Sequence, residues 1–173
     1  MRKGLVVLAA MLVGVASFAV AAPAAPSGQT ASDKTIVTVA SGDKRFTTLV
    51  ALVKQAGLVM TLNGKGPFTV FAPTNAAFAK LKAQAPDTFA AVGSDKALLK
   101  KVLTYHVVKG KVPAAKVVTL NGKSVKTLSG QSLRVSVRGG NVFLNGSTRV
   151  TKTDVLASNG VIHVVNKVLI PKS

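Results

Sequence analysis

The chain has 173 residues, of which 48% are hydrophobic and 16% charged, and its formal net charge at pH 7 is +18. This length suits a single domain built around one hydrophobic core. The chain contains no cysteine and no glutamate, which excludes disulfides, a lipid anchor on cysteine, and catalysis by either of these side chains.

The N-terminal segment has the pattern of an export signal. Arg2 and Lys3 precede an apolar run over residues 5–20, and small residues surround position 21. This order predicts a signal peptide over residues 1–21. The alternative is a membrane anchor, because the run is about long enough to cross a bilayer as a helix. No basic stop-transfer cluster follows it, which favours cleavage.

Residues 22–33 are rich in alanine, proline, serine and glycine and have no apolar period, which predicts a flexible linker. We therefore expect the folded domain to span residues 34–171. Loss of the signal peptide removes two positive charges, so the net charge falls from +18 to +16.

The first half of the domain is predicted to be mainly helical. Apolar residues in 43–56 recur at helical spacing, with Asp43 as the N-cap and Gly57 as the stop. A turn cluster then leads into a short strand over residues 68–71. Thr74 and its neighbour can cap a helix that continues through residues 78 and 81.

The second half begins with a helix and continues in strands. Asp95 is predicted to cap a helix that leads into a strand over residues 105–108. Residues 133–137 alternate apolar and polar, and a Gly-Gly hairpin turn joins them to residues 141–144. Two Asn-Gly turns follow, and segments 161–165 and 168–170 complete the sheet. Helices early and strands late predict an α+β fold.

Three blocks in this order resemble the fasciclin domain. The first is residues 66–75 with Phe78, and the second is residues 99–108 with the pair Tyr105-His106. The third runs from residue 159 to residue 171. Together they extend over nearly the whole predicted domain.

The resemblance implies a wedge-shaped β-sandwich of two twisted sheets with flanking helices. It also implies a role in cell adhesion, through binding to cell-surface receptors, matrix proteins or polysaccharides. In animal matrix members, receptor recognition is ascribed to the tyrosine–histidine pair and to an Asp-Ile pair before the third block. The matching candidate partner-binding residues are Tyr105, His106, Asp154 and Val155.

The residues themselves also allow structural roles at these positions. His106 and His163 lie in apolar segments, where a buried imidazole bonds to backbone or to a side chain such as Asn75. Tyr105 can be a core aromatic with its hydroxyl anchored. Asp154 can be a turn carboxylate that accepts backbone N–H groups. We favour these structural roles, and the contact roles remain the alternative.

Catalytic and cofactor patterns are missing from the sequence. The two histidines stand 57 positions apart, and no Gly-x-Ser-x-Gly motif or metal-ligand spacing occurs. The glycines around Lys65 form a turn and lack the residues of a phosphate-binding loop. We therefore expect a protein that is not an enzyme and uses no cofactor or metal, with a hydrolase of unrecognised type as the remaining alternative.

The positive charge suggests a second function. Arg134 and Arg138 share the outward face of one predicted strand and are candidate polyanion-binding residues. One tyrosine and no tryptophan supply few stacking platforms, which disfavours specific nucleic-acid binding. The alternative function is a basic envelope protein that binds anionic polysaccharide or lipopolysaccharide by charge. In either case we expect a secreted or periplasmic location.

Overall fold

The computed structural model describes residues 33–172. The predicted signal peptide lies outside the described residues, as does all of the predicted linker except Asp33. The helices of the described part are α1 (Ile36–Ser41), the 3₁₀ turn η1 (Lys44–Phe46), α2 (Thr47–Gln55), α3 (Val59–Leu62), α4 (Asn75–Gln84), α5 (Pro86–Ser94), α6 (Lys96–Tyr105) and α7 (Ala114–Thr119). The strands are β1 (Phe68–Pro73), β2 (Val107–Lys109), β3 (Ser124–Lys126), β4 (Ser132–Arg138), β5 (Asn141–Leu144), β6 (Thr148–Ala157) and β7 (Gly160–Val165).

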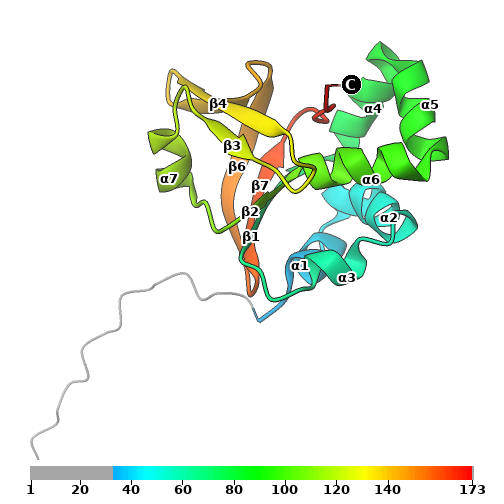
Figure 1. The fold of residues 1–173 in the computed structure, drawn as a ribbon, viewed down its shortest axis with the longest axis horizontal. Coiled ribbons are helices and arrows are strands. Elements are labelled where there is room, and N and C mark those ends of the chain that lie inside the picture. Colours follow the sequence, from blue (N-terminus) through cyan, green and yellow to red (C-terminus); the bar gives the residue numbers. More distant parts are fainter. Residues whose placement is uncertain (1–32, 173) are drawn as a thin grey trace, which may run out of the picture.

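The strands form one half of the molecule and α1–α6 the other, while α7 lies beside the strands (Figure 1). The strand order is β2-β1-β7-β6-β5-β4-β3. Among the described strands, only β1 and β7 pair in parallel. This arrangement confirms the predicted α+β class, and the two expected sheets are joined through the long strand β6. A bridge between Val108 and Thr127 brings the two ends of the order together, so the sheet is nearly a barrel.

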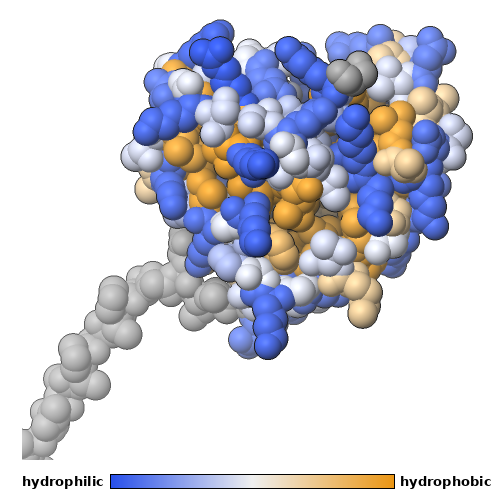
Figure 2. All heavy atoms as spheres, in the orientation of Figure 1, coloured by the Kyte–Doolittle hydropathy of each residue, from blue (hydrophilic) through white to orange (hydrophobic). Residues whose placement is uncertain are grey.

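Two apolar clusters make up the core. The larger lies between the helices and strands β1 and β7 and includes Phe46, Leu99 and Ile162. The smaller lies inside the curved strands and includes Leu133 and Leu144. On the face seen in Figure 2, apolar residues show between the strands and the helices, with hydrophilic side chains around them. Within residues 33–172, no helix has both the length and the apolar character needed to cross a membrane.

The predicted helix starts and hairpin are confirmed. Thr74 accepts a hydrogen bond from the Ala77 N–H at the start of α4, and Asp95 accepts two at the start of α6. Gly139 and Gly140 both have positive φ, which a two-residue hairpin between β4 and β5 requires. These local signals are strong because few residue types can accept a hydrogen bond from the first N–H groups of a helix or adopt positive φ.

Two predicted elements have other bounds than expected, and a third does not form. The helix over residues 43–56 is divided into η1 and α2, although Asp43 does cap η1. The strand over residues 105–108 begins only at Val107, because Tyr105 is still the last residue of α6. Residues 168–170 form no strand. There the Leu169 N–H bonds to the ring of His106 instead of a neighbouring strand.

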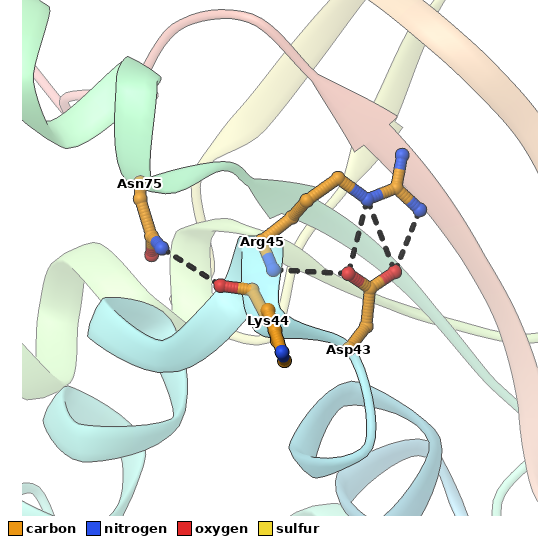
Figure 3. Close-up of polar contacts among 4 residues, drawn as sticks. All are labelled: Asp43, Lys44, Arg45 and Asn75. Carbon is orange, nitrogen blue, oxygen red and sulfur yellow. Dashed lines mark hydrogen bonds and ion pairs between the residues drawn. The ribbon is translucent and has the colours of Figure 1, made fainter.

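Asn75 links α4 to the start of α2 and is not a partner of either histidine. Its Nδ2 donates to the Lys44 carbonyl and to Thr47 Oγ1, both at 2.9 Å, and its Oδ1 accepts from the Thr48 N–H. Of the two kinds of histidine partner predicted, backbone groups are confirmed and the side chain of Asn75 is not. Beside this link, the Arg45 guanidinium holds Asp43 in an ion pair (Figure 3).

Candidate functional site

His106 is the C-cap residue of α6 and is fully enclosed, with 2% of its surface exposed. Its Nδ1 lies 2.8 Å from the Val102 carbonyl, and its Nε2 lies 2.9 Å from the Leu169 nitrogen. The carbonyl can only accept and the amide can only donate, so Nδ1 carries the proton and Nε2 accepts. Desolvation by burial lowers the pKa of His106 to about 4, against the opposing bond to Val102. The ring is therefore neutral at pH 7 and joins α6 to the C-terminal segment.

Tyr105 is buried as well, with 3% of its surface exposed. Its hydroxyl donates to the Ser132 carbonyl at 3.3 Å and accepts from Asn145 Nδ2 at 2.9 Å. These partners lie at the start of β4 and just after β5. Tyr105 forms part of the lining of a surface hollow whose rim includes Arg134 and Lys172. Tyr105 therefore holds two other lining residues, Ser132 and Asn145, in place through its hydroxyl.

His163 connects strand β7 to the segment before α7. Its Nε2 donates to the Val112 carbonyl at 2.8 Å, and its Nδ1 accepts from the Asp154 N–H at 3.4 Å. Its ring stacks on Phe71 with 5.6 Å between centroids. Desolvation lowers the pKa of His163, while the bond to Val112 and the Asp154 charge oppose that shift.

Asp154 stands at an irregularity in the pairing of β6 with β7, and its φ is +57°. Its carboxylate accepts a hydrogen bond from the Ala114 N–H at 2.8 Å. Ala114 begins α7, whose N-cap residue is Pro113 and therefore has no capping side chain. The predicted capping of a backbone N–H is confirmed, but the carboxylate lies in a strand rather than in a turn and caps a distant helix. Its neighbour Val155 is partly buried against the larger core cluster.

Replacing Asp154 with alanine is expected to lower the free energy of unfolding by about 2 kcal/mol, because the cap is lost and alanine disfavours positive φ. Asp154→Asn keeps both an acceptor oxygen and tolerance of this φ, so it is expected to cost much less. Asp154→Gly accepts the φ but loses the cap, and is expected to lie between them. Chemical denaturation at pH 7 measures all three, and equal losses for alanine and asparagine would contradict the capping role.

The four candidate partner-binding residues do not form one exposed site. Tyr105 and His106 are buried, while Asp154 and Val155 are partly buried. Among the described residues, no hydrogen bond joins the first pair to the second. Tyr105 lines the hollow beside β4, and Asp154 caps the start of α7, whereas His106 bonds to Leu169 and Val155 packs against the larger core cluster.

The two candidate polyanion-binding residues lie as predicted on the outward face of β4. Arg134 and Arg138 are exposed, while the alternating residues Leu133 and Val135 are buried. Strand register adds a further cation, because Ser136 pairs with Phe143 and Phe143 pairs with Arg149. Paired residues of neighbouring strands project from the same face. Arg149 therefore shares the face with the two predicted arginines.

Sequence reasoning did not find Arg149 or Phe143 as parts of this surface. They lie on β5 and β6, and only the pairing of these strands with β4 brings them beside the two arginines. The useful signal was the hairpin pairing of β4 with β5, which fixes what lies opposite Ser136. Within residues 33–172, no three histidine, cysteine or acidic side chains are grouped so that they could hold a metal ion.

Comparisons with known proteins agree with this architecture. A family model for the fasciclin domain matches residues 44–171. Protein sll1483 of Synechocystis is 49% identical to this chain over 142 residues, covering 82% of this chain and 76% of the relative. Immunogenic protein MPB70 of Mycobacterium bovis is 38% identical over 168 residues, covering 91% and 80%. Transforming growth factor-beta-induced protein ig-h3 of Sus scrofa is 36% identical, covering 82% of this chain and 21% of that longer protein.

A solved structure has the same fold. A FAS1 domain pair from the insect cell adhesion molecule fasciclin I superimposes with a TM-score of 0.72 at 20% identity, covering 81% of this chain and 52% of that chain. At this identity the likeness concerns the fold alone. The family match spans most of the sequence and agrees with the three blocks and the strand order. The chain therefore belongs to the fasciclin domain family.

Proposed function

We propose that this protein is an exported, non-catalytic adhesion protein that binds cell-surface or matrix proteins or polysaccharides outside the cytoplasm. The observation that carries the proposal is the fasciclin domain match over residues 44–171, which accounts for nearly all of the described chain. A structural neighbour with this fold comes from an insect cell adhesion molecule. The predicted signal peptide supports a secreted or periplasmic location. No cofactor or metal is part of the proposed mechanism.

The candidate partner-binding residues act in this proposal by shaping the surface. Tyr105 supports the hollow beside Arg134, and His106 fixes the C-terminal segment through Leu169. Asp154 holds the start of α7, and Val155 packs against the larger core cluster. Binding of a partner to the hollow or to α7 therefore depends on these residues, because they hold the surface in place, although the partner does not contact most of their atoms.

The second candidate function is binding of anionic polysaccharide or lipopolysaccharide by charge alone. Its support is the net charge of +18 for the whole chain, with no glutamate and only five acidic residues in total. A protein of this charge attracts polyanions through its overall field. The two functions differ in how strongly binding depends on ionic strength.

Salt dependence separates the two functions. The purified protein is added to intact envelope or surface material from its source, and the bound fraction is measured between low and physiological ionic strength. Adhesion through a packed interface is expected to persist at physiological salt, where the Debye length is about 8 Å. Binding by charge alone is expected to fall steeply with each increase of salt. Absence of binding at every ionic strength contradicts both functions.

A further inference from the structure

The outward face of β4, β5 and β6 carries a triangle of arginines around an aromatic ring. Arg134 and Arg138 are four residues apart on β4, which corresponds to about 13 Å at ~3.3 Å per residue. Arg149 lies across two strand spacings from Ser136, or about 10 Å at ~4.8 Å per spacing. Phe143, on the middle strand, is partly exposed between them. The three arginines with Phe143 are called the arginine face below.

The charges of the arginine face are not neutralised within the described chain. Of the four arginines in residues 33–172, Arg45 forms an ion pair with Asp43. The other three have no acidic partner among those residues. Arg149 Nη2 instead donates to Asn141 Oδ1 at 2.6 Å, and Asn141 pairs with Arg138 across the hairpin. The Arg149 guanidinium thus lies at Asn141, the residue that pairs with Arg138, and neither arginine forms an ion pair among the described residues.

The other side chains of this face are hydroxyl and amide groups and the exposed cation Lys126, which pairs with Ser132 at the start of β4. The register places Ser124 beside Arg134, Ser136 beside Phe143, and Asn141 beside Arg138. A surface of guanidinium forks, hydroxyls and one flat apolar ring fits a ligand with carboxylates, hydroxyls and apolar ring faces. A lipid surface instead requires large exposed apolar side chains, and those in the described chain, Met60, Val118 and Ile170, are not on these strands.

We infer that the arginine face binds an extended acidic polysaccharide whose sugar units carry carboxylates. Guanidinium groups at the corners of the triangle pair with carboxylates of separate sugar units, and the Phe143 ring lies under the apolar face of a sugar between them. The hollow at Tyr105 continues this surface past Arg134. The inference rests on the proposed function and names a partner class for it.

Binding to polygalacturonate, with neutral dextran as the uncharged comparison, tests this inference by calorimetry at several salt concentrations. The triple variant Arg134→Gln, Arg138→Gln, Arg149→Gln is expected to lose about tenfold or more in affinity at physiological salt. Its slope of log affinity against log salt is expected to fall by up to about one per lost contact. The matched control is Lys80→Gln, Lys82→Gln, Lys101→Gln, which removes the same charge from exposed positions on α4 and α6.

Two further variants separate geometry from charge. Replacing the three arginines with lysines keeps the charge and removes the planar fork, and is expected to weaken binding clearly. Phe143→Leu is expected to weaken binding without changing the salt slope. Circular dichroism checks that each variant is folded. If the triple variant is unfolded, the single variant Arg138→Gln replaces it in the binding measurement.

Equal losses in the arginine and lysine triple variants overturn the inference, because the attraction then belongs to the overall charge. Failure of the unmodified protein to bind polygalacturonate also overturns it. In either case, persistent binding to source envelope at physiological salt leaves the proposed function standing. Loss of that envelope binding contradicts the proposed function itself.

Discussion

Replacing His106 with alanine is expected to lower the free energy of unfolding by about 3 kcal/mol. The change leaves the Val102 carbonyl and the Leu169 N–H without partners in a buried place. It also enlarges an apolar cavity of about 30 Å³ that His106 already borders, between the N-terminal helices and β1. Both effects act in the same direction. Chemical denaturation at pH 7 measures the loss.

Two comparison variants show whether the loss of stability comes from the missing hydrogen bonds or from the cavity. His106→Phe fills the space but makes neither hydrogen bond, so it is expected to remain clearly less stable than the natural protein. Lys101→Ala, on the exposed side of the same helix, is expected to change stability by no more than about 0.5 kcal/mol. An unchanged unfolding midpoint in His106→Ala together with lost partner binding would make His106 a contact residue.

The parts of the fold that were predictable from sequence are those fixed by local chemistry. Thr74 and Asp95 cap their helices because their side chains reach the N–H groups of the same turn. Gly139 and Gly140 form the hairpin because both need positive φ. The segment at Leu169 was wrongly assigned to a strand because its backbone partner is a histidine 63 positions earlier in the chain. No local pattern carries that information.

The candidate sites divide in the same way. The alternation of β4 was enough to place Arg134 and Arg138 outward, and the structure agrees. Arg149 joins them only through the pairing of β4 with β5 and of β5 with β6, which no local pattern shows. Asp154 was recognised as a capping carboxylate, but the helix it caps starts 40 positions earlier. Such long-range contacts arise from tertiary packing.

Acid is expected to destabilise the fold between pH 6.5 and about 4. Burial holds the pKa of His106 at about 4, against 6.5 in the unfolded chain. The unfolded chain therefore binds more protons in this window, and stability falls as pH decreases through it. The full difference corresponds to about 3 kcal/mol at ~1.4 kcal/mol per pH unit. His163, whose pKa is also lowered, adds to the loss in the same direction.

Denaturation curves recorded from pH 7 to pH 4 test this expectation. The stability of the natural protein should be constant above pH 7 and decline steadily below pH 6.5. His106→Phe should show a shallower decline, because it removes one of the two histidines whose pKa is lowered in the folded state. Asp43 contributes little in this window, because its ion pair with Arg45 lowers its pKa from 3.8 to about 2 and its share of the loss therefore falls mainly below pH 4. A flat profile between pH 6.5 and 4.5 would mean that the histidine rings are protonated in the folded state, and their assigned role as neutral bridges between backbone groups would be wrong.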